Sequence, residues 1–395
     1  MKKKKILFVI PNLGAGGAEK SLVNLLNSFD FERYDVDLLL MHKSGIFLEM
    51  IPAEVKVLDV PELYHYFSVS FGKSLLSFVK KGRLDLIIYK ILFTISNKSR
   101  KNKTTAEQIN WKFMRHFFKG IETEYDVAIG YLEKSANYVV VDSIKARKKI
   151  GYIHNDYSAM MMDRQIDEYF FNKFDYIVTV SEKCVESLVR VFPQHKQKFR
   201  MIRNFTPINY IKTLANADEE HLNGRKYILS IGRLSEQKSF NLAVDAFSMI
   251  AERYHDLEWI VLGEGHLRLS LQEQINKKDV THRFHLVGNK KNPYPYIANA
   301  LLYVQTSIFE GKSIAIDEAK IFAKPIIVTD YPTAKDQIDN FKTGLIAEVN
   351  PEDIANKIEI LINNKQLRDE LSKNLENEKF CDESEIEKLY KLIES

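Results

Sequence analysis

Short apolar segments alternate with helix-like segments along almost the whole chain, and this alternation constrains the fold more than any other feature. The expected strands are residues 6–10, 36–40, 55–60, 126–131, 149–153 and 176–180 in the first half, and 227–231, 259–262, 284–287, 301–305, 326–329 and 345–349 in the second. Most of them are nearly all apolar, as strands are when helices cover both faces of their sheet. Strands separated by helical segments indicate parallel sheets, so we expect an α/β fold.

The length of the chain and one polar stretch indicate two domains. A chain of 395 residues normally forms two domains, sometimes three. Residues 204–209 and the polar residues 216–225 separate the two halves and are interpreted as the linker. We therefore place one domain at 1–205 and a second at 206–381.

The cysteines and the N-terminal residues indicate a cytoplasmic protein. Cys184 and Cys381 are too few for a disulfide scaffold or a metal cluster, and they fit a reducing compartment. Four lysines after Met1 imitate the start of a signal peptide, but the apolar run that follows ends after five residues at Pro11. No segment approaches the ~20 apolar residues of a membrane-spanning helix. The net charge of +4 does not by itself indicate nucleic acid.

Residues 67–119 form an insertion that is both basic and rich in large apolar side chains. It contains twelve lysines and arginines against Asp85 and Glu107, a surplus of ten that exceeds the net charge of the whole chain. Basic, aromatic and helical character is typical of a surface that faces anionic lipid, and we favour contact with the inner face of the cell membrane. The alternative is that the apolar side packs on the domain and the lysines are only solvated. Nucleic acid is a weaker alternative, because no matching fold signature accompanies the charge.

A glycine-rich loop follows the first expected strand. Gly14, Gly16 and Gly17 permit a tight turn and a close approach of the backbone to a ligand at a helix N-terminus. The third glycine of a dinucleotide fingerprint would fall at Glu19, and the P-loop pattern is absent. An ordinary strand-to-helix turn remains the alternative.

His154 follows the expected strand 149–153. Ligands of open α/β sheets bind at this end of the strands, where a histidine can donate to a hydroxyl group or stabilise charge near a reacting centre. A purely structural role is the alternative, because a lone histidine is more often structural.

Two cations follow the first expected strand of the second half. Arg233 and Lys238 are five residues apart on a turn that begins with Gly232. An arginine fork and a lysine point charge on one loop suit a diphosphate. The alternative is that both are ordinary surface cations.

Glu310 and Glu318 lie eight residues apart between the expected strands 301–305 and 326–329. We expect a strand–loop–helix turn with Glu318 about two turns into the helix and on the same face as Glu310, since eight residues make about 2.2 turns. Free backbone N–H groups and two carboxylates would then line a polyhydroxylated ligand that bears phosphate. The N–H groups that we expect there belong to Gly311, Lys312, Ser313 and Ile314.

These motifs, in this order, resemble those of retaining GT-B glycosyltransferases of family 4. Glu310–Glu318 resembles the E-x7-E element of that family, and Gly232–Lys238 resembles its G-R-x-x-x-x-K phosphate site. Gly263 and Gly288 match its turn after the next strand and its loop beside the base. The chain departs from the family at Lys312-Ser-Ile, where an aromatic and a glycine are usual, and at Arg203-Asn-Phe, where Pro-Asn-Gly is usual.

The resemblance implies two Rossmann-like parallel-sheet domains that face a cleft. Domain 1–205 would bind the acceptor, domain 206–381 would bind a nucleotide-sugar, and a last helix at 382–395 would pack back on the first domain. A UDP-sugar is favoured over a GDP-sugar as the donor. The chain shows no Asp-x-Asp element or zinc-ligand spacing, so we expect no metal and no other cofactor.

The resemblance also implies roles for single residues. The catalytic residues would be His154 at the reacting face, Arg233 and Lys238 at the departing diphosphate, and Glu310 at the transferred sugar, whereas Glu318 would hold the ribose. The donor-binding set would be Gly16, Gly17, Gly232, Gly263, Gly288, Gly311, Lys312, Ser313, Ile314 and Glu318.

The function that follows is transfer of a sugar, with retention at the anomeric carbon, to a lipid-linked saccharide of a bacterial capsule or cell wall. The enzyme would be cytoplasmic and peripheral to the membrane. Two alternatives are an epimerase or hydrolase of nucleotide-sugars with this fold, and a partner subunit without activity of its own.

Overall fold

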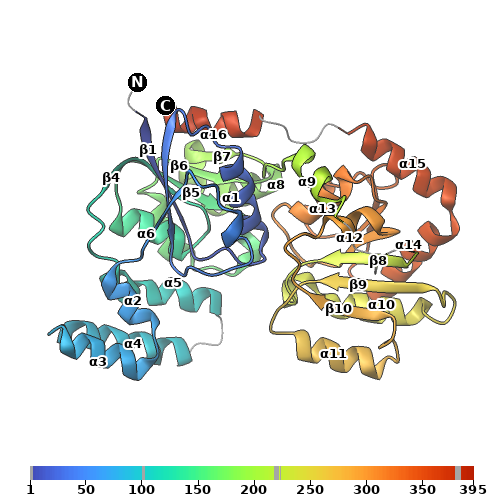
Figure 1. Ribbon diagram of the computed structural model, residues 1–395, viewed down its shortest axis with the longest axis horizontal. Helices are drawn as coiled ribbons and strands as arrows, with labels where there is room; N and C mark the ends of the chain where they lie inside the picture. The colour runs from blue at the N-terminus through green and yellow to red at the C-terminus, as the bar shows by residue number, and fades with distance from the viewer. Residues whose placement is uncertain (1–2, 100–102, 218–221, 223, 379–383) are drawn as a thin grey trace. The chain divides into compact units, whose positions relative to one another are not determined.

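The chain folds around two parallel β-sheets, each at the centre of a compact unit (Figure 1). The computed structural model describes residues 3–99, 103–217, 222, 224–378 and 384–395. The first unit comprises Met1–Gly14, Leu25–Ile202 and Ile386–Ser395, and the second comprises Ala15–Asn24 and Arg203–Glu385. Cys381, two cations of the basic insertion (Arg100 and Lys101) and residues 382–383 of the expected last helix lie outside the described residues.

The first unit contains a seven-stranded sheet in the order β3-β2-β1-β4-β5-β6-β7, with every neighbouring pair parallel. Its strands are β1 (Lys4–Ile10), β2 (Tyr34–Leu40), β3 (Lys56–Leu58), β4 (Glu124–Gly130), β5 (Lys145–Ile153), β6 (Tyr176–Thr179) and β7 (Phe199–Met201). Its helices are α2 (Glu62–Ser68), α3 (Phe71–Lys80), α4 (Leu84–Ser99), α5 (Lys103–Met114), α6 (Ser135–Ser143), α7 (Arg164–Phe171), α8 (Glu182–Val191) and most of α16 (Ser384–Glu394).

The second unit contains a six-stranded parallel sheet in the order β10-β9-β8-β11-β12-β13. Its strands are β8 (Lys226–Ile231), β9 (Leu257–Leu262), β10 (Phe284–Gly288), β11 (Leu302–Gln305), β12 (Ile326–Thr329) and β13 (Leu345–Ala347). Its helices are α9 (Ile208–Leu214), α10 (Phe240–Ile250), α11 (Arg268–Lys277), α12 (Tyr294–Asn299), α13 (Ile314–Ile321), α14 (Pro351–Asn363) and α15 (Lys365–Glu376).

Helix α1 (Gly17–Asn27) crosses the division between the units, which the domain limits expected from the sequence did not foresee. Its first turns belong to the second unit, where Ser21 Oγ donates to Asn204 Oδ1 at 2.8 Å. Asn24 Nδ2 donates to the carbonyl of Phe205 at 3.4 Å. Hydrogen bonds to the segment after Ile202 therefore hold the first turns of α1 to the second unit, which includes Gly16 and Gly17 but not Gly14.

All twelve predicted strands are present, and the α/β class with two parallel sheets is confirmed. One strand, β7, was missed, because it has only three residues and Arg200 interrupts its apolar pattern. β5 begins four residues earlier than expected. Its first residues are charged, yet Lys145 and Lys148 pair in register with β4, so the ladder extends past the apolar run.

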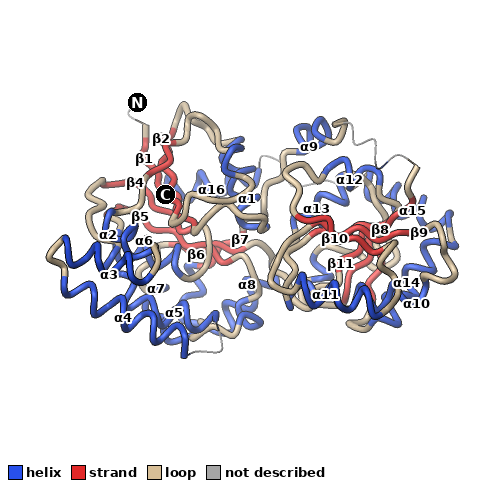
Figure 2. The backbone as a smooth tube through the Cα atoms, turned by 60° about the horizontal axis from the view of Figure 1, so that its bottom comes forward, coloured by secondary structure: helices blue, strands red, loops and turns tan. Residues whose placement is uncertain are grey.

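Both faces of the second sheet are buried, as the apolar strands predicted. Along β8, Ile228 points into one cluster of buried side chains with Trp259 and Phe247. Its neighbours Tyr227 and Leu229 point into a second cluster on the opposite face. Side chains alternate across a strand, so each face needs its own cover of helices. Figure 2 shows helices on both sides of each sheet.

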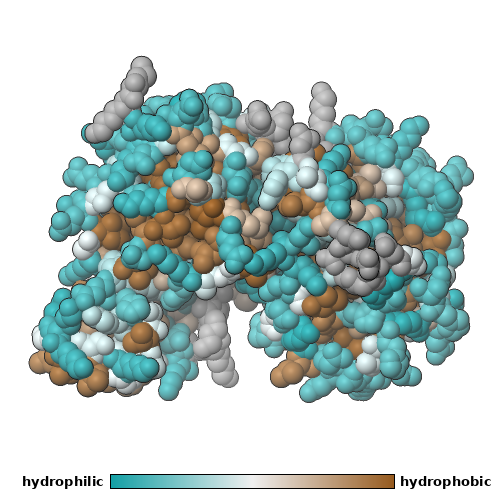
Figure 3. Space-filling view, in the orientation of Figure 1, coloured by the Kyte–Doolittle hydropathy of each residue, from teal (hydrophilic) through white to brown (hydrophobic). Residues whose placement is uncertain are grey.

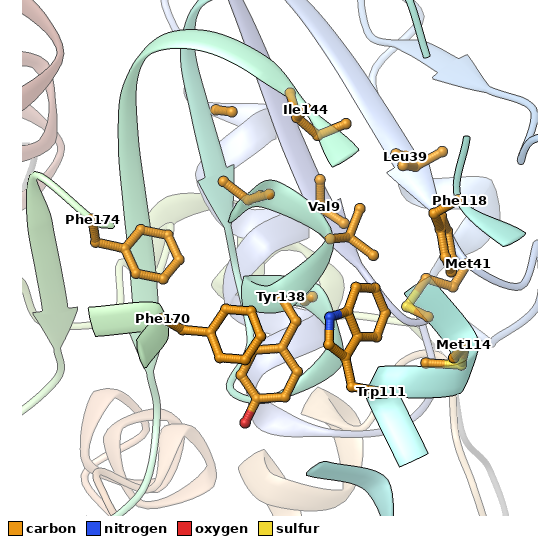
Figure 4. Close-up of a cluster of buried hydrophobic side chains, with 14 of the residues drawn as sticks. Val9, Leu39, Met41, Trp111, Met114, Phe118, Tyr138, Ile144, Phe170 and Phe174 are labelled. Carbon is orange, nitrogen blue, oxygen red and sulfur yellow. The ribbon is translucent and has the colours of Figure 1, made fainter. Parts of the chain in front are cut away.

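In the first unit, the insertion contributes part of the core. Trp111 and Met114 of α5, followed by Phe118, pack with Val9 of β1 and Tyr138 of α6 (Figure 4). Phe67, Phe78 and Phe117 of the insertion are also buried in this core. Packing on the domain therefore accounts for the inner side of the insertion.

The last helix, α16, packs on the first unit through its buried residues Ile386, Leu389, Tyr390 and Ile393. The hydroxyl of Tyr390 accepts from the backbone N–H of Asp30 at 2.8 Å. Lys148 Nζ donates to the carbonyl of Leu392 at 2.8 Å, which places a cation at the C-terminal end of the helix.

A buried carboxylate joins the insertion to the rest of the first unit. Asp167 of α7 accepts from the hydroxyls of Tyr138 and Tyr157, each at 2.5 Å, and from Gln108 Nε2 of α5 at 2.9 Å. Burial raises the pKa of Asp167 to about 6, although these three donors oppose the rise. Three hydrogen bonds thus do not fully replace the water that the carboxylate has lost.

We predict that Asp167 makes the folded protein more stable as the pH falls from about 7 to 4. Between about pH 6 and pH 4 the folded state holds a proton that the unfolded chain, with an ordinary aspartate pKa near 3.8, largely lacks. The free energy of unfolding of the wild type should rise by roughly 2 kcal/mol relative to Asp167→Asn between pH 7 and pH 4. Chemical denaturation of both proteins at several pH values measures this difference. A constant difference would contradict the prediction.

Candidate functional site

The candidate donor site lies where the strand order of the second sheet reverses. β8 pairs with β9 on one side and with β11 on the other, so the loops after β8 and β11 leave the sheet in opposite directions. Open α/β sheets bind ligands at this kind of position, outside the carboxyl ends of the strands. The loop after β8 carries Arg233 and Lys238, and the loop after β11 carries Glu310.

Three of the predicted glycines meet at the ends of neighbouring strands. The N–H of Gly232 donates to the carbonyl of Leu262, and the N–H of Gly263 donates to the carbonyl of Gly288, each at 3.0 Å. A Cβ atom added to Gly263 would lie 1.8 Å from the carbonyl oxygen of Gly232. The backbones of these loops therefore approach so closely that no side chain fits at position 263.

Three hydrogen bonds join the loops after β8 and β11, and a fourth holds the loop after β11 from Thr333 in the loop after β12. Thr306 Oγ1 donates to the carbonyl of Lys238, and Gln237 Nε2 donates to the carbonyl of Phe309. The N–H of Ile308 donates to the carbonyl of Gln237 at 2.9 Å, and Thr333 Oγ1 holds the carbonyl of Glu310 at 2.9 Å. These bonds fix the position of Lys238 relative to Glu310.

Lys238 and Glu310 form a largely buried ion pair. Lys238 Nζ lies 2.6 Å from Glu310 Oε1, and the hydroxyl of Ser307 donates to the same oxygen at 2.6 Å. Gln237 Nε2 reaches the other carboxylate oxygen at 3.4 Å. The sequence placed both residues in the site, and the structure brings them into direct contact, which the sequence analysis did not foresee.

Arg233 is the exposed cation of the same loop. Its side chain is 63% exposed, and its guanidinium lies 3.9 Å from Glu19 Oε1 at the start of α1. Five N–H donors in a planar fork can bind two phosphate oxygens at once. Arg233 and Lys238 thus differ in kind: one is open to a ligand, and the other is anchored to a carboxylate.

Glu318 is buried on α13 and pairs with a lysine of the glycine-rich segment. Lys20 Nζ lies 2.5 Å from Glu318 Oε1, and the hydroxyl of Tyr294 donates to that oxygen at 3.1 Å. The ammonium of Lys20 also lies 4.7 Å from the centre of the Tyr294 ring, within the range of a cation–π contact. Lys20 was not predicted as a site residue.

The expected depth of Glu318 in its helix is wrong. α13 begins at Ile314, so Glu318 lies just over one turn into the helix and not two. The cause is Gln337, whose Oε1 accepts from the N–H of Ser313 at 2.8 Å and whose Nε2 donates to the carbonyl of Ser313 at 2.9 Å. This pair of bonds holds Ser313 in an extended conformation immediately before the helix.

The expectation of free N–H groups after Gly311 is also wrong in part. The N–H of Ser313 is bound to Gln337, and its hydroxyl donates to Gln305 Oε1 at 2.8 Å. The ammonium of Lys312 pairs with Asp317, one turn further along the chain. Side chains of the protein therefore engage the N–H of Ser313 and the charge of Lys312.

The predicted glycines of the first loop lie immediately before and at the start of α1. Gly17 is the first residue of the helix, and the N–H of Lys20 donates to the carbonyl of Gly16 at 3.1 Å. A Cβ at Gly16 would lie 2.1 Å from a carboxylate oxygen of Glu19, whereas a Cβ at Gly17 would meet nothing within 4 Å. A side chain at Gly16 would therefore require the flexible Glu19 side chain to move, and one at Gly17 would require no movement.

In the first unit, His154 follows β5 and is buried. Its Nε2 lies 3.1 Å from the carbonyl of Tyr131, which can only accept, so Nε2 carries the proton. Burial lowers the pKa of the imidazole, which favours the neutral ring. Nδ1 is buried and has no hydrogen-bond partner within the described residues. The neutral ring thus offers an acceptor at Nδ1.

Glu133 supports this histidine loop and was missed from the sequence. One oxygen of Glu133 accepts from the N–H of His154 at 3.1 Å, and the other accepts from Asn155 Nδ2 at 3.0 Å. Tyr152 stacks on the imidazole at 5.4 Å between ring centres. A carboxylate that follows the neighbouring strand β4 was the available signal, since adjacent parallel strands end at the same edge.

The described residues contain neither a group of metal ligands nor a helix that could cross a membrane. Among residues 3–99, 103–217, 222, 224–378 and 384–395, no three His, Cys, Asp or Glu side chains are grouped so that they could hold a metal ion. No helix in the part of the chain that the structure describes combines the length and the apolar character needed to cross a bilayer. Independence of a metal stays a prediction.

Comparison with known proteins connects the second unit to a family. Residues 212–378 match the sequence model of the family described as glycosyl transferases group 1. This stretch includes every predicted site residue from Gly232 to Glu318.

Relatives and solved structures extend the likeness to the rest of the chain. An uncharacterized glycosyltransferase of Methanocaldococcus jannaschii is 29% identical over 176 residues, which cover 43% of this chain and less than half, also 43%, of the relative. In Campylobacter jejuni, the N-acetylgalactosamine-N,N'-diacetylbacillosaminyl-diphospho-undecaprenol 4-alpha-N-acetylgalactosaminyltransferase is 24% identical over 361 residues, or 88% of this chain and 87% of the relative. A mutant of S. aureus TarM in complex with Fondaparinux, alpha-GlcNAc-glycerol and UDP has a TM-score of 0.71 and 17% identity, and the match covers 99% of this chain and 100% of that one.

The fold is thus that of GT-B glycosyltransferases, with two Rossmann-like domains built on sheets of seven and six parallel strands. Within it, residues 212–378 carry the sequence pattern of group 1.

We predict that Gly263→Ala destabilises the protein by about 1–3 kcal/mol, because the new methyl group would overlap the carbonyl oxygen of Gly232. Gly72→Ala is the matched control, since a Cβ at that exposed helical position meets nothing within 4 Å. Thermal and urea denaturation compare the two variants with the wild type. Equal stabilities of Gly263→Ala and Gly72→Ala would contradict the close approach of the two loops.

Proposed function

We propose that the protein is a retaining glycosyltransferase that moves a sugar from a nucleotide-diphosphate sugar to an acceptor without a metal ion. The observation that carries the proposal is the group formed by Arg233, Lys238 and Glu310 at the strand-order reversal of the second sheet. It lies within the residues that match the group 1 family. A cation pair and a carboxylate at this position meet the needs of a donor that combines a diphosphate with a sugar.

The cations serve the leaving group. When the bond between the anomeric carbon and the diphosphate breaks, negative charge grows on the departing phosphate oxygen. The exposed fork of Arg233 binds the phosphates, and Lys238 has donors beyond the one directed at Glu310. Donors already fixed by the protein stabilise that charge without further reorganisation.

Glu310 orients the transferred sugar and is not a nucleophile. Lys238 and Ser307 both bind its Oε1, which lowers the electron density available for attack on a carbon atom. Retention through departure and return on one face of the sugar needs no enzyme nucleophile, and this course suits the site. The carboxylate of Glu318 accepts hydrogen bonds from the ribose hydroxyls of the donor. Donor binding then competes with the ion pair between Lys20 and the same carboxylate.

The proposed donor is a UDP-sugar and the proposed acceptor is a lipid-linked saccharide of the bacterial surface. UDP is present in the TarM complex with the similar fold, and the Campylobacter relative is named for a diphospho-undecaprenol substrate. The acceptor is assigned to the first domain, where the buried acceptor atom Nδ1 of His154 is available to a hydroxyl group.

We predict that UDP and one of its sugars raise the melting temperature, and that GDP does not. A ligand at about 100 times its dissociation constant adds about 2.7 kcal/mol of stability. A thermal-shift series with UDP, GDP and a panel of their sugars provides the measurement. Absence of any shift would contradict the proposed donor and favour a partner subunit, and release of nucleotide without an acceptor would favour a hydrolase.

We predict that Arg233→Ala lowers the transfer rate at least tenfold, which corresponds to about 1.4 kcal/mol of lost transition-state stabilisation. Arg253→Ala is the control, because Arg253 is a partly exposed arginine of the same unit that pairs with Glu359.

Lys238→Ala should lower both the transfer rate and the stability, since it leaves Glu310 buried without its cation. Single-turnover rates with the UDP-sugar that gives the largest thermal shift measure the effect on transfer, and melting curves measure the effect on stability. An unchanged rate in Arg233→Ala would contradict its role.

A further inference from the structure

Helix α4 is apolar on two opposite sides. Its inner side carries Leu86, which is fully buried, and Phe93, whose ring contacts the ring of Phe67 at 4.8 Å between centres. The large apolar side chains exposed on its outer side are Leu84, Ile88, Ile91, Leu92 and Ile95. Their spacing of three and four residues forms one continuous stripe along the helix.

Helix α3 widens this stripe. The two helices pack side by side at one end of the first unit (Figure 1). Phe71, Leu76 and Val79 of α3 are exposed, and apolar side chains gather at the lower left edge of Figure 3, over these two helices. We call the exposed apolar residues of α3 and α4 the outer stripe. A surface helix normally turns a polar face to water, so a contiguous stripe of this kind marks an interaction surface.

One charged residue of α4 is on the side where an apolar residue is usual, although Asp85 and Lys98 of the same helix are exposed. Lys90 is on the inner side, where its ammonium donates to the carbonyl of Phe67 at 2.6 Å and lies 4.2 Å from the Phe67 ring centre. Burial lowers the pKa of Lys90. Ile88 and Ile95, each 60% exposed, are meanwhile on the solvent side. Among the described residues, the core of the first unit includes Leu86, Ile87, Tyr89 and Phe93 of α4 and none of the exposed apolar residues of its outer side.

Cations border the outer stripe. Lys73 and Lys80 lie three and four residues from Leu76 on α3, and Lys98 lies three residues after Ile95 on α4, so each is on the neighbouring surface. All three are exposed and form no ion pair with any residue that the structure describes. The acid on these helices, Asp85, is bound by the guanidinium of Arg83 at 2.7 and 2.9 Å.

We propose that the outer stripe docks on an anionic membrane surface. The apolar side chains would enter the boundary between headgroups and acyl chains, and the three lysines would lie at the level of the anionic headgroups. Charge complementarity favours lipid over a second copy of this chain, because self-association through the outer stripe would bring like-charged borders together. The proposal rests on the proposed function in one respect, that the acceptor is lipid-linked and lies at such a surface.

The test is co-sedimentation of the full chain with vesicles, which needs no donor or acceptor. We expect binding to vesicles of phosphatidylcholine and phosphatidylglycerol in a 3:1 ratio at about 50 mM salt, and weak binding to phosphatidylcholine alone. Ile88→Gln with Ile95→Gln should lower the partition constant about tenfold on the anionic vesicles. Lys80→Gln with Lys98→Gln should lower it about tenfold at low salt, and this difference should shrink at about 500 mM salt.

The matched control lies on α11 of the second unit. Leu269 is 79% exposed and Lys277 is exposed, so Leu269→Gln with Lys277→Gln changes the same residue types outside the outer stripe. This variant should sediment like the wild type. A thermal shift with UDP that is unchanged in every variant shows that each is folded and that its donor site is intact.

Three results would overturn the proposal. The first is a wild type that stays in the supernatant with both kinds of vesicle. The second is an Ile88→Gln, Ile95→Gln variant that sediments like the wild type. The third is a wild-type dimer that this variant converts to a monomer, because that result would assign the outer stripe to a second copy of the chain. Vesicle binding by a protein that shows no shift with UDP would refute the proposed function alone and leave the docking surface in place.

Discussion

The reversal of strand order between β8 and β11 is the constraint on which the candidate site depends. The loops that follow these neighbouring parallel strands leave the sheet in opposite directions, and ligands of open α/β sheets bind at the junction where such loops diverge. The hydrogen bonds from Thr306 and Gln237 close the base of this junction, and the Lys238–Glu310 pair spans it. A buried pair of this kind is costly to separate, so its two members hold a fixed geometry. Arg233, which is mostly exposed, is the adaptable member of the group.

The glycines of the second unit act through backbone distance. Gly232, Gly263 and Gly288 bring three loops together so closely that no side chain fits at position 263. Gln337 fixes the backbone of the loop before α13, because its side-chain amide binds both the N–H and the carbonyl of Ser313. One side chain from a distant part of the chain thus decides where α13 begins, and it therefore decides how far Glu318 lies from the start of that helix.

The sequence predicted what local patterns determine and missed what long-range contacts determine. Apolar runs located twelve strands, but β7 has too few residues to show a pattern. The spacing of Arg233 and Lys238 placed both on one loop. It contained no sign that Lys238 would meet Glu310, 72 residues further along the chain. The contacts of Lys20 with Glu318 and of Gln337 with Ser313 likewise arise only when the chain has folded. The tautomer of His154 depends on a carbonyl group of another strand end.

The insertion shows the same limit and points beyond folding. Its composition supported two interpretations, packing on the domain or contact with lipid, because charge and aromatic content do not say which side of a helix is inside. The structure assigns Trp111, Phe117 and Leu86 to the core, so packing is part of the answer. It leaves Ile88 and Ile95 in water, where each apolar side chain forgoes the free energy of burial. A lysine at either position would be better solvated and would disturb no contact of the core. Since the described core of the first unit includes neither isoleucine, their presence on that side agrees with the docking on lipid that we propose for the outer stripe.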